Sequence, residues 1–438
     1  MPFISISLMV LSLLRTSLCS AINNTRLLGD LLNGYQRFTR PGADYSVPTY
    51  VSVEFDLLSI RDFVALTNKF AITGVFELSW HDERISWDPT AYGGIEDIHI
   101  PQELVWKPEL INTKPFTVVK PIGIPTFGII YHYTGDAFWI PGDNYDTSCE
   151  ADVTYYPFDS QTCTFRFSDW TQIPGTIFIT SSKNELGLKL YVTNPMWDIT
   201  STVIETDHDE FGNFVYFDIH FKRLYGFYVL NMVLPICLIS FVNIFVFFLP
   251  AESGERIGFS ITVFLALSVL LTILAEHLPK ASRPRISIIC YLIFFQTTIS
   301  IFVLLATILS LRFFFHSDSE EVPRFWQRFI QIVDLKCVCR RKKRQISNAN
   351  AETKSITLSK ELFATDVEDS VDLNDMKIIG KEKRPQDNSA HQGVDTMARV
   401  TWKQVGQAFD KVCAVVFSLL NIINIAIYFM IMYVNGKI

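Results

Sequence analysis

Residues 225–249 read YGFYVLNMVLPICLISFVNIFVFFL, a run of 25 residues without a charged side chain. Three further apolar blocks follow at residues 257–275, 286–315 and 412–434. An α-helix rises about 1.5 Å per residue, so about 20 apolar residues cross about 30 Å of hydrocarbon. The alternative is a set of buried core helices, but four such blocks exceed what a soluble core uses. The blocks therefore predict four transmembrane helices.

The composition of the chain excludes several classes of protein. Of its 438 residues 19% are charged, against about 25% in an average soluble protein. The net charge of −7 does not suggest the basic face of a nucleic-acid-binding protein. The sequence contains no metal cluster, nucleophile elbow or phosphate-binding loop, so we expect neither a cofactor nor enzymatic activity.

The N-terminus of the chain indicates export. Residues 1–20 contain an apolar stretch that ends in small residues, which is typical of a signal peptide. Residues 21–224 would then lie outside the cell, with a glycosylation sequence at Asn23. If the N-terminal domain is exported in this way, the first apolar block enters the membrane from the outside. The fourth block then ends on the outside. Both the N-terminal domain and the C-terminus are therefore expected to be extracellular.

Residues 225–315 hold the first three spans, and residues 316–395 are expected to be cytosolic. The basic run KCVCRRKKR at 336–344 agrees with the positive-inside rule. Residues 322–335 predict an amphipathic helix along the membrane surface, with one face formed by Phe325, Trp326, Phe329, Ile330 and Val333. Residues 345–393 are polar and aperiodic, which predicts disorder. From residue 396 a helical pattern continues into the fourth span and the segment 396–438.

Residues 45–222 alternate between apolar and polar side chains in short runs. Val51-Ser52-Val53-Glu54-Phe55 is one such run, and turn residues such as Pro141-Gly142-Asp143 separate the runs. This period of two predicts half-buried strands. Many short strands predict an immunoglobulin-like β-sandwich. A helical pattern at residues 24–34 precedes it.

Cys149 and Cys163 would be the only two cysteines of the exported domain, so we expect them to form a disulfide bond. Thirteen residues separate them, including Tyr156-Pro157-Phe158-Asp159. Such a loop in a β-rich exported domain, followed by four spans, resembles the Cys-loop pentameric ligand-gated ion channels of the nicotinic and serotonin-gated branch. Further matching motifs are Trp106-Lys107-Pro108-Glu109, the segment LPAESGER at 249–256 and Trp402-Lys403-Gln404-Val405.

The resemblance implies five subunits around a pore lined by the second span. The assembly would be a homopentamer, or a heteropentamer with related subunits, among the lipids of the plasma membrane, with a postsynaptic membrane as one candidate location. Steps of three or four residues along this span mark one helical face, which carries Glu255, Gly258, Thr262, Leu265, Val269 and Glu276, with Glu252 just before it.

Five copies of this face would form rings of negative charge at Glu252, Glu255 and Glu276, which concentrate cations. Anion-selective members of the family carry an extra Pro-Ala before this span, where residues 253–255 read Ser-Gly-Glu here. The resemblance therefore implies a cation-selective pore. Leu265 and Val269 would form an apolar constriction that empties of water and acts as the gate. The alternative is that Leu265 packs against lipid or a neighbouring helix.

The resemblance also implies which elements couple ligand binding to the pore. They are the sequence Tyr156-Pro157-Phe158-Asp159, a loop at residues 59–64 that contains Asp62, and Pro279 after the pore helix. Arg223 aligns with a basic residue of the family, and we expect it to pair with Asp159. Ala65 stands where the family usually has an acidic residue in the first loop.

In this family the ligand binds between subunits, where aromatic side chains hold an amine by cation–π attraction. Trp170 matches the central tryptophan, whereas Thr113 and Val75 stand where two other aromatic walls are expected. The candidate replacements are Phe211, Phe214 and Tyr216, with Ile130, Phe138 and Ile140 on the facing subunit. The chain lacks the adjacent cysteines of acetylcholine-binding subunits. We therefore expect a small-molecule agonist of unknown identity: another amine, a hydrophobic molecule or protons.

Two alternatives to a homomeric channel stay open within this fold. The depleted aromatic box allows an accessory subunit that conducts only in heteromers. A binding or adhesion protein with a silent pore is the second alternative, and the complete pore-facing stripe argues against it.

Overall fold

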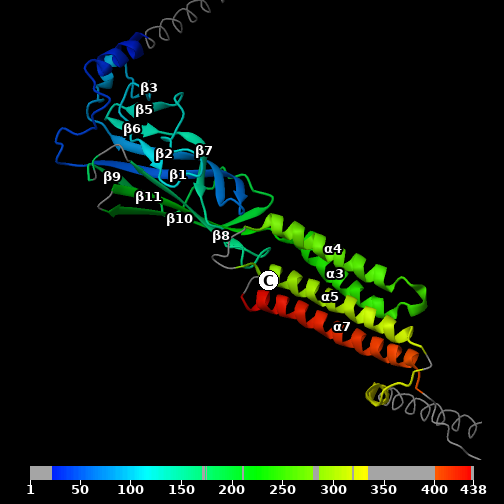
Figure 1. The fold of residues 1–438 in the computed structure, drawn as a ribbon. Helices are drawn as coiled ribbons and strands as arrows, with labels where there is room; N and C mark the ends of the chain where they lie inside the picture. Colours follow the sequence, from blue (N-terminus) through cyan, green and yellow to red (C-terminus); the bar gives the residue numbers. More distant parts are fainter. Residues whose placement is uncertain are drawn as a thin grey trace, which may run out of the picture. The chain divides into compact units, whose positions relative to one another are not determined.

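A computed structural model describes residues 22–169, 173, 175–209, 212–279, 286–317, 320–333 and 400–435. In these ranges the chain forms a two-sheet β domain and then four long helices (Figure 1). The expected signal peptide, Trp170, Phe211 and the segment 345–393 lie outside the described residues.

Seven strands form the larger sheet. They are β1 Thr49–Val64, β2 Lys69–His81, β3 Asp97–Pro101, β5 Gly128–His132, β6 Asp136–Trp139, β7 Gly142–Ser148 and β9 Ile177–Thr180. Six of them run in the order β3-β5-β6-β2-β1-β9, and β7 pairs with β2. The pairs are antiparallel except for β1 and β9, which are parallel.

Four strands form the smaller sheet. They are β4 Leu110–Asn112, β8 Ser160–Asp169, β10 Trp197–Asp209 and β11 Gly212–Arg223, in the order β10-β11-β8-β4. A helix at residues 22–32 precedes both sheets, and a short 3₁₀ turn at Pro89–Tyr92 separates β2 from β3. The predicted β-sandwich with an N-terminal helix is thus confirmed.

Aromatic side chains from both sheets meet in the core of the sandwich. Alternate residues of β1 are buried, as its sequence predicts. Phe55 of β1 lies 5.2 Å from Phe217 of β11 between ring centroids, and Phe76 of β2 lies 4.9 Å from Phe167 of β8. Such ring pairs each contribute about 0.5–1.5 kcal/mol beyond the burial of their area. The phenylalanine-rich composition therefore fills the space between the sheets.

The prediction of a loop at residues 59–64 was wrong. These residues complete β1, with Phe63 opposite Phe70 and Val64 opposite Lys69 in β2. The turn lies at residues 65–68 instead. Two register shifts, at Leu57/Ser59 and Ile60/Asp62, interrupt the strand. A bulge breaks the alternation of side chains, which explains why the sequence pattern did not extend the strand this far.

Four described helices are long and apolar enough to cross a membrane. They span Gly226–Phe248, Arg256–His277 (α4), Ile288–Phe314 (α5) and Trp402–Val434 (α7). Their positions agree with the four predicted blocks. Helix α7 is continuous over 33 residues, which agrees with the helical pattern before the fourth block.

The first of these helices is not regular. It consists of α2 Gly226–Tyr228, a π-helical turn at Val229–Val233, α3 Leu234–Asn243 and a 3₁₀ segment at Ile244–Phe248. Pro235 follows the π turn and has no amide hydrogen to donate to the preceding turn. The missing donor of Pro235 therefore explains why the helix widens into a π-helical turn here.

Residues Cys237–Ser268 and Phe295–Asn424 form one compact unit. Its core joins side chains of three helical segments, namely Ile244, Val246, Phe247, Val303, Ala306, Cys413 and Ala414. Residues Met1–Ile236, Val269–Phe294 and Ile425–Ile438 form the other compact unit. The β domain thus belongs to the same unit as the first turns of α5 and the last turns of α7.

The amphipathic segment predicted at residues 322–335 forms a helix at residues 324–333. Its apolar side chains pack with Val322 against the first turns of α7, in a cluster of Trp326, Phe329, Ile330, Val333, Trp402, Val405 and Ala408. Phe325 is 71% exposed and lies outside this cluster. Ile330 of this face is thus buried and Trp326, Phe329 and Val333 are half-buried within the chain, and the contact of the exposed Phe325 with the membrane surface stays a prediction.

Candidate functional site

Cys149 and Cys163 form the predicted disulfide bond, with 5.4 Å between their Cα atoms. Cys149 follows β7, and Cys163 lies within β8. The backbone N–H of Cys149 donates to the carbonyl oxygen of Asn68 in the β1–β2 turn, at 2.8 Å. The disulfide therefore ties the loop between the cysteines to both sheets of the sandwich.

Asp159 in this loop forms a two-pronged ion pair with Arg223 at the end of β11. The Nε atom of Arg223 lies 2.7 Å from Oδ1 of Asp159, and its Nη2 atom lies 3.0 Å from Oδ2. Both side chains are buried, at 8% and 1% exposure. Gln161 donates a further hydrogen bond to Asp159, at 2.6 Å. The expected pairing of Arg223 with Asp159 is thus observed, and no charge in it is left without a partner.

Three aromatic rings surround the guanidinium of Arg223. Its Cζ atom lies 4.2 Å from the ring centre of Trp197, 4.9 Å from Tyr156 and 5.0 Å from Tyr228. Burial alone lowers the pKa of Arg223, but its hydrogen bonds to Asp159 outweigh burial and raise the pKa above the usual value. Arg223 is therefore a fixed positive charge at the end of β11.

The disulfide loop also contacts three membrane-type helices within its compact unit. The carbonyl oxygen of Thr154 accepts a hydrogen bond from the N–H of Ile288 at the start of α5, at 2.9 Å. The Tyr155 hydroxyl donates to Asn435 after the end of α7, at 2.9 Å. The Tyr156 hydroxyl lies 3.4 Å from the Met232 sulfur in the first helix. The sequence did not single out Thr154, Tyr155, Ile288 or Asn435, because these contacts depend on how the loop is folded.

Phe158 and Pro157 complete the predicted coupling sequence. The Phe158 ring is buried and lies 4.9 Å from that of Tyr225. The Tyr156–Pro157 peptide bond is cis.

The two other predicted coupling residues lie outside the disulfide loop. Asp62 is exposed in β1 opposite Ala71. Pro279 is half-buried directly after α4, and the residues that follow it lie outside the described part of the chain.

Arg166 lies on the outer face of the four-stranded sheet. Its neighbours in β8, Phe165 and Phe167, are both buried in the core. Alternate residues of a strand point to opposite faces, so Arg166 points outward. Tyr216 of β11 lies directly opposite it in the ladder. The sequence analysis missed Arg166, although a charged residue between two core phenylalanines was a usable signal.

Three of the predicted ligand-wall residues lie around Arg166. Its Cζ atom lies 3.8 Å from the ring centre of Phe214 and 5.8 Å from that of Tyr216. The N–H and hydroxyl of Thr113 both donate to the backbone carbonyl of Arg166, at 2.8 and 3.1 Å. Phe214 is only 2% exposed. The ring of Phe214 is therefore already in contact with a cation of the chain itself.

The three residues expected on the facing subunit, and Val75 at the position of a missing aromatic wall of that subunit, lie on the seven-stranded sheet. Ile130 and Phe138 are opposite each other in the β5–β6 ladder, and Ile140 follows β6. Phe138 and Ile140 are each 49% exposed, whereas Val75 and Ile130 are half-buried. Three of the four thus lie together on one apolar area.

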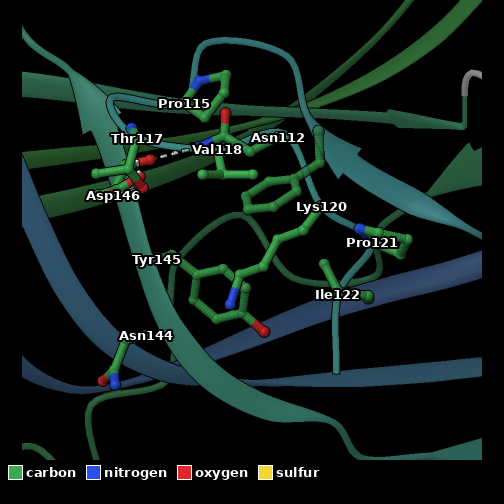
Figure 2. Close-up of a pocket in the computed structure, with 11 residues that line it drawn as sticks. Asn112, Pro115, Thr117, Val118, Lys120, Pro121, Ile122, Asn144, Tyr145 and Asp146 are labelled. Carbon is green, nitrogen blue, oxygen red and sulfur yellow. Dashed lines mark hydrogen bonds between the residues drawn. The ribbon is translucent and has the colours of Figure 1, made fainter. Parts of the chain in front are cut away.

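A pocket of about 260 Å³ lies between the segment 112–122 and β7 (Figure 2). Tyr145 lines it and is buried, and its hydroxyl has no hydrogen-bond partner among the described residues. Lys120 and Asp143 form an ion pair of 2.5 Å near it, and Thr117 donates to Asp146 at 2.7 Å. The pocket is lined by none of the predicted ligand-wall residues.

Helix α4 exposes every residue of the predicted pore stripe. The exposed set is Glu255, just before the helix, with Gly258, Thr262, Leu265, Val269 and Glu276. The remaining faces carry the buried residues Val263, Leu267 and Leu274. Glu252 is exposed in a short turn that Gly254 ends at a φ of 71°, a conformation that favours glycine.

Arg256 directly follows Glu255 but is buried in the helical unit. Its Nη1 atom lies 2.9 Å from Oδ2 of Asp410 in α7, and its Nε atom donates to the carbonyl oxygen of Leu249 at 2.7 Å. Ser310 of α5 donates to Oδ1 of Asp410 at 2.5 Å. The exposed fractions of Arg256 and Asp410 are 6% and 12%. The sequence analysis missed this pair, because its members are 154 residues apart.

Comparison with known proteins agrees with this geometry. Residues 24–225 match the neurotransmitter-gated ion-channel ligand binding domain, and residues 232–400 match the neurotransmitter-gated ion-channel transmembrane region. The chain is 31% identical to an acetylcholine receptor subunit alpha-like of Manduca sexta, over 72% of this chain and 64% of that protein. The chain therefore spans slightly less than two thirds of the length of this relative.

Two similar proteins come from Xenopus laevis. Acetylcholine receptor subunit alpha-1-B is 30% identical over 71% of this chain and 69% of that protein. Acetylcholine receptor subunit alpha-1-A is 26% identical over 97% of this chain and 96% of that protein.

Proposed function

This chain belongs to the neurotransmitter-gated ion-channel family, and we propose that it is a subunit of a pentameric, cation-selective ligand-gated channel in the plasma membrane. Members of the family are ligand-gated ion-channel receptors and not enzymes. Five copies, or copies with related subunits, would surround a pore lined by α4. The agonist would bind between β domains outside the cell.

One observation carries the pore proposal: the exposed faces of α4 and α7 differ in chemistry. Every exposed residue of α7 between Val415 and Met430 is apolar, which suits contact with lipid. The exposed stripe that runs from Glu255 along α4 contains hydroxyl groups and carboxylates, with Thr262 and Glu276 among them. Polar groups in a membrane span face protein or water rather than lipid. The stripe of α4 is thus suited to line an aqueous pore.

The same stripe supports a gate and a selectivity ring. Leu265 and Val269 are 56% and 51% exposed in the single chain. Their repetition around a fivefold axis would form an apolar constriction that excludes water. Glu252 and Glu255, before the helix, and Glu276 near its end would form rings that attract cations.

Coupling between the β domain and the pore would pass through the disulfide loop. The loop contacts the beginning of the first helix, the start of α5 and the residue after α7. The buried Arg223–Asp159 pair holds the end of β11 to this loop, just before the first helix. A shift of β11 on ligand binding would therefore move the loop and the helix together.

The functional test is a voltage-clamp recording from cells that express the chain with Leu265→Thr. Hydration of the gate should produce a current without agonist, and the reversal potential should follow the sodium gradient and not the chloride gradient. Leu419→Thr is the matched control, because Leu419 of α7 is 54% exposed but belongs to the apolar face. It should leave the pore closed.

Selectivity for cations over anions is tested in the Leu265→Thr variant. Adding Glu255→Gln should lower the permeability of cations relative to anions, whereas Glu103→Gln on the β domain should not. An unchanged reversal potential would remove the assigned role of Glu255. Absence of current with protein at the cell surface would favour the second candidate, an accessory subunit of heteropentamers, which the incomplete aromatic wall supports.

A further inference from the structure

We propose that Arg166 is an anion-accepting position of the ligand wall, so that the agonist carries a carboxylate or an equivalent anionic group. This inference rests on the proposed function and specifies the chemical class of its ligand. It begins from the surroundings of Arg166 on the outer face of the four-stranded sheet.

Arg166 differs from the two other buried or half-buried arginines described above. Arg223 and Arg256 each form an ion pair with an aspartate. Among the described residues, no carboxylate forms an ion pair with Arg166, and its buried Nε atom has no hydrogen-bond partner. A guanidinium has five N–H donors in a planar fork that matches a carboxylate. Arg166 is therefore placed to bind an anion that no carboxylate of the described residues supplies.

The aromatic rings orient this guanidinium rather than neutralise it. Phe214 lies 3.8 Å from the Cζ atom of Arg166 and covers one side of the fork, and Tyr216 lies further along the same side of the sheet at 5.8 Å. The backbone of Arg166 is fixed by two hydrogen bonds from Thr113. A side chain held in this way loses little conformational freedom when an anion binds.

The same arrangement disfavours an ammonium ligand. A cationic agonist would need the ring face of Phe214, which already contacts Arg166. It would also have to lie close to a like charge in a partly desolvated place. The exposed carboxylates Glu205 and Asp207 lie opposite Tyr216 and Phe214 on β10. They can hold a positive group at the outer end of a zwitterionic ligand, away from Arg166.

The test is direct binding to the purified full-length chain in nanodiscs, which does not require a conducting channel. Three probes share a phenyl ring and a four-carbon chain and differ in the head group, which is anionic, neutral or cationic: phenylbutyrate, phenylbutanol and phenylbutyltrimethylammonium. Intrinsic tryptophan fluorescence reports their affinities. For the natural sequence we expect the carboxylate probe to bind best.

Arg166→Gln should weaken binding of the carboxylate probe by about tenfold or more, the usual effect of losing a charge-assisted hydrogen bond. It should at the same time strengthen binding of the ammonium probe, because the face of Phe214 becomes free. Arg61→Gln is the matched control, since Arg61 is an exposed arginine of the larger sheet bonded to Asn144. It should change neither affinity.

Arg166→Lys provides a second variant if Arg166→Gln does not fold. Lysine keeps the charge but not the planar fork, so the affinity for the carboxylate probe should fall several-fold. The affinity for the ammonium probe should not rise. The proposal is overturned if the natural sequence prefers the ammonium probe, if it binds none of the three, or if the order of affinities is the same in every variant. A channel that fails to conduct but shows the expected order would contradict the proposed function alone.

Discussion

The two buried arginine–aspartate pairs of this chain have the same chemistry in different surroundings. Arg223 and Asp159 lie in the unit with the β domain, and Arg256 and Asp410 lie in the helical unit. The first pair is two-pronged and is enclosed by three aromatic rings. The second is single-pronged, and polar partners complete it, namely the Leu249 carbonyl and the Ser310 hydroxyl.

The difference shows what each pair does for the fold. Arg223 joins the end of β11 to the disulfide loop, so its pair holds two segments of backbone together. Arg256 follows the exposed Glu255, and successive helical residues point about 100° apart. Asp410 therefore keeps a positive charge turned inward, away from the exposed acidic stripe of α4. We expect the first pair to control coupling and the second to control the charge near the pore.

Asp159→Ala should have the largest effect. Removing one partner of a buried pair costs about 3–5 kcal/mol, because it leaves an uncompensated charge. We expect loss of assembled protein at the cell surface and a lower midpoint of thermal unfolding, measured by size-exclusion chromatography with fluorescence detection. The matched control is Lys222→Gln, which breaks an exposed pair with Asp198 and should cost at most about 1 kcal/mol. Equal effects of the two variants would contradict the assigned importance of burial.

Asp410→Asn should destabilise the protein by about 3 kcal/mol, somewhat less than Asp159→Ala, because asparagine keeps a hydrogen-bond acceptor for Ser310. On a Leu265→Thr background, the released charge of Arg256 should also lower cation selectivity, measured as a shift in reversal potential. Lys411→Gln changes an exposed neighbour and should do neither. A destabilised variant with unchanged selectivity would limit Asp410 to a structural role.

Ser310→Ala tests the polar surroundings of the second pair. It removes one hydrogen bond to Asp410 and one to Arg256, and we expect a loss of about 1–2 kcal/mol in stability. Chemical denaturation of the detergent-solubilised protein measures this effect. A loss as large as that of Asp410→Asn would mean that the hydroxyl of Ser310 contributes as much to stability as the ion pair between α4 and α7.

The double variant Arg256→Met/Asp410→Leu should have the smallest effect on stability. Replacing a buried pair with apolar side chains of similar volume is often neutral, within about 1 kcal/mol. The midpoint of thermal unfolding should therefore return close to that of the natural sequence. The equivalent double variant at Arg223 and Asp159 should not recover, because the buried Gln161 would lose its acceptor and the two-pronged link between β11 and the disulfide loop would be lost. Full recovery at both places would remove the distinction between the two pairs.

Patterns among neighbouring residues predicted much of the architecture. The apolar blocks predicted the four long helices, and alternation predicted the strands of the sandwich. The pairing of Cys149 with Cys163 followed because they are the only two cysteines of the exported domain. The association of Arg223 with Asp159 came from the family resemblance and was then observed. The loop at residues 59–64 was predicted wrongly, because β1 continues through two register shifts there.

The sequence by itself determined the class of elements, their order and the stripe of α4, because the periods of strands and helices depend only on neighbouring residues. Only the tertiary structure decided the surroundings of the charged groups. The stacking of Arg166 on Phe214 depends on the register between β8 and β11, and the pairing of Arg256 with Asp410 depends on how α7 packs. Contacts between residues far apart in the chain are set by packing of the whole fold, and no local pattern encodes them.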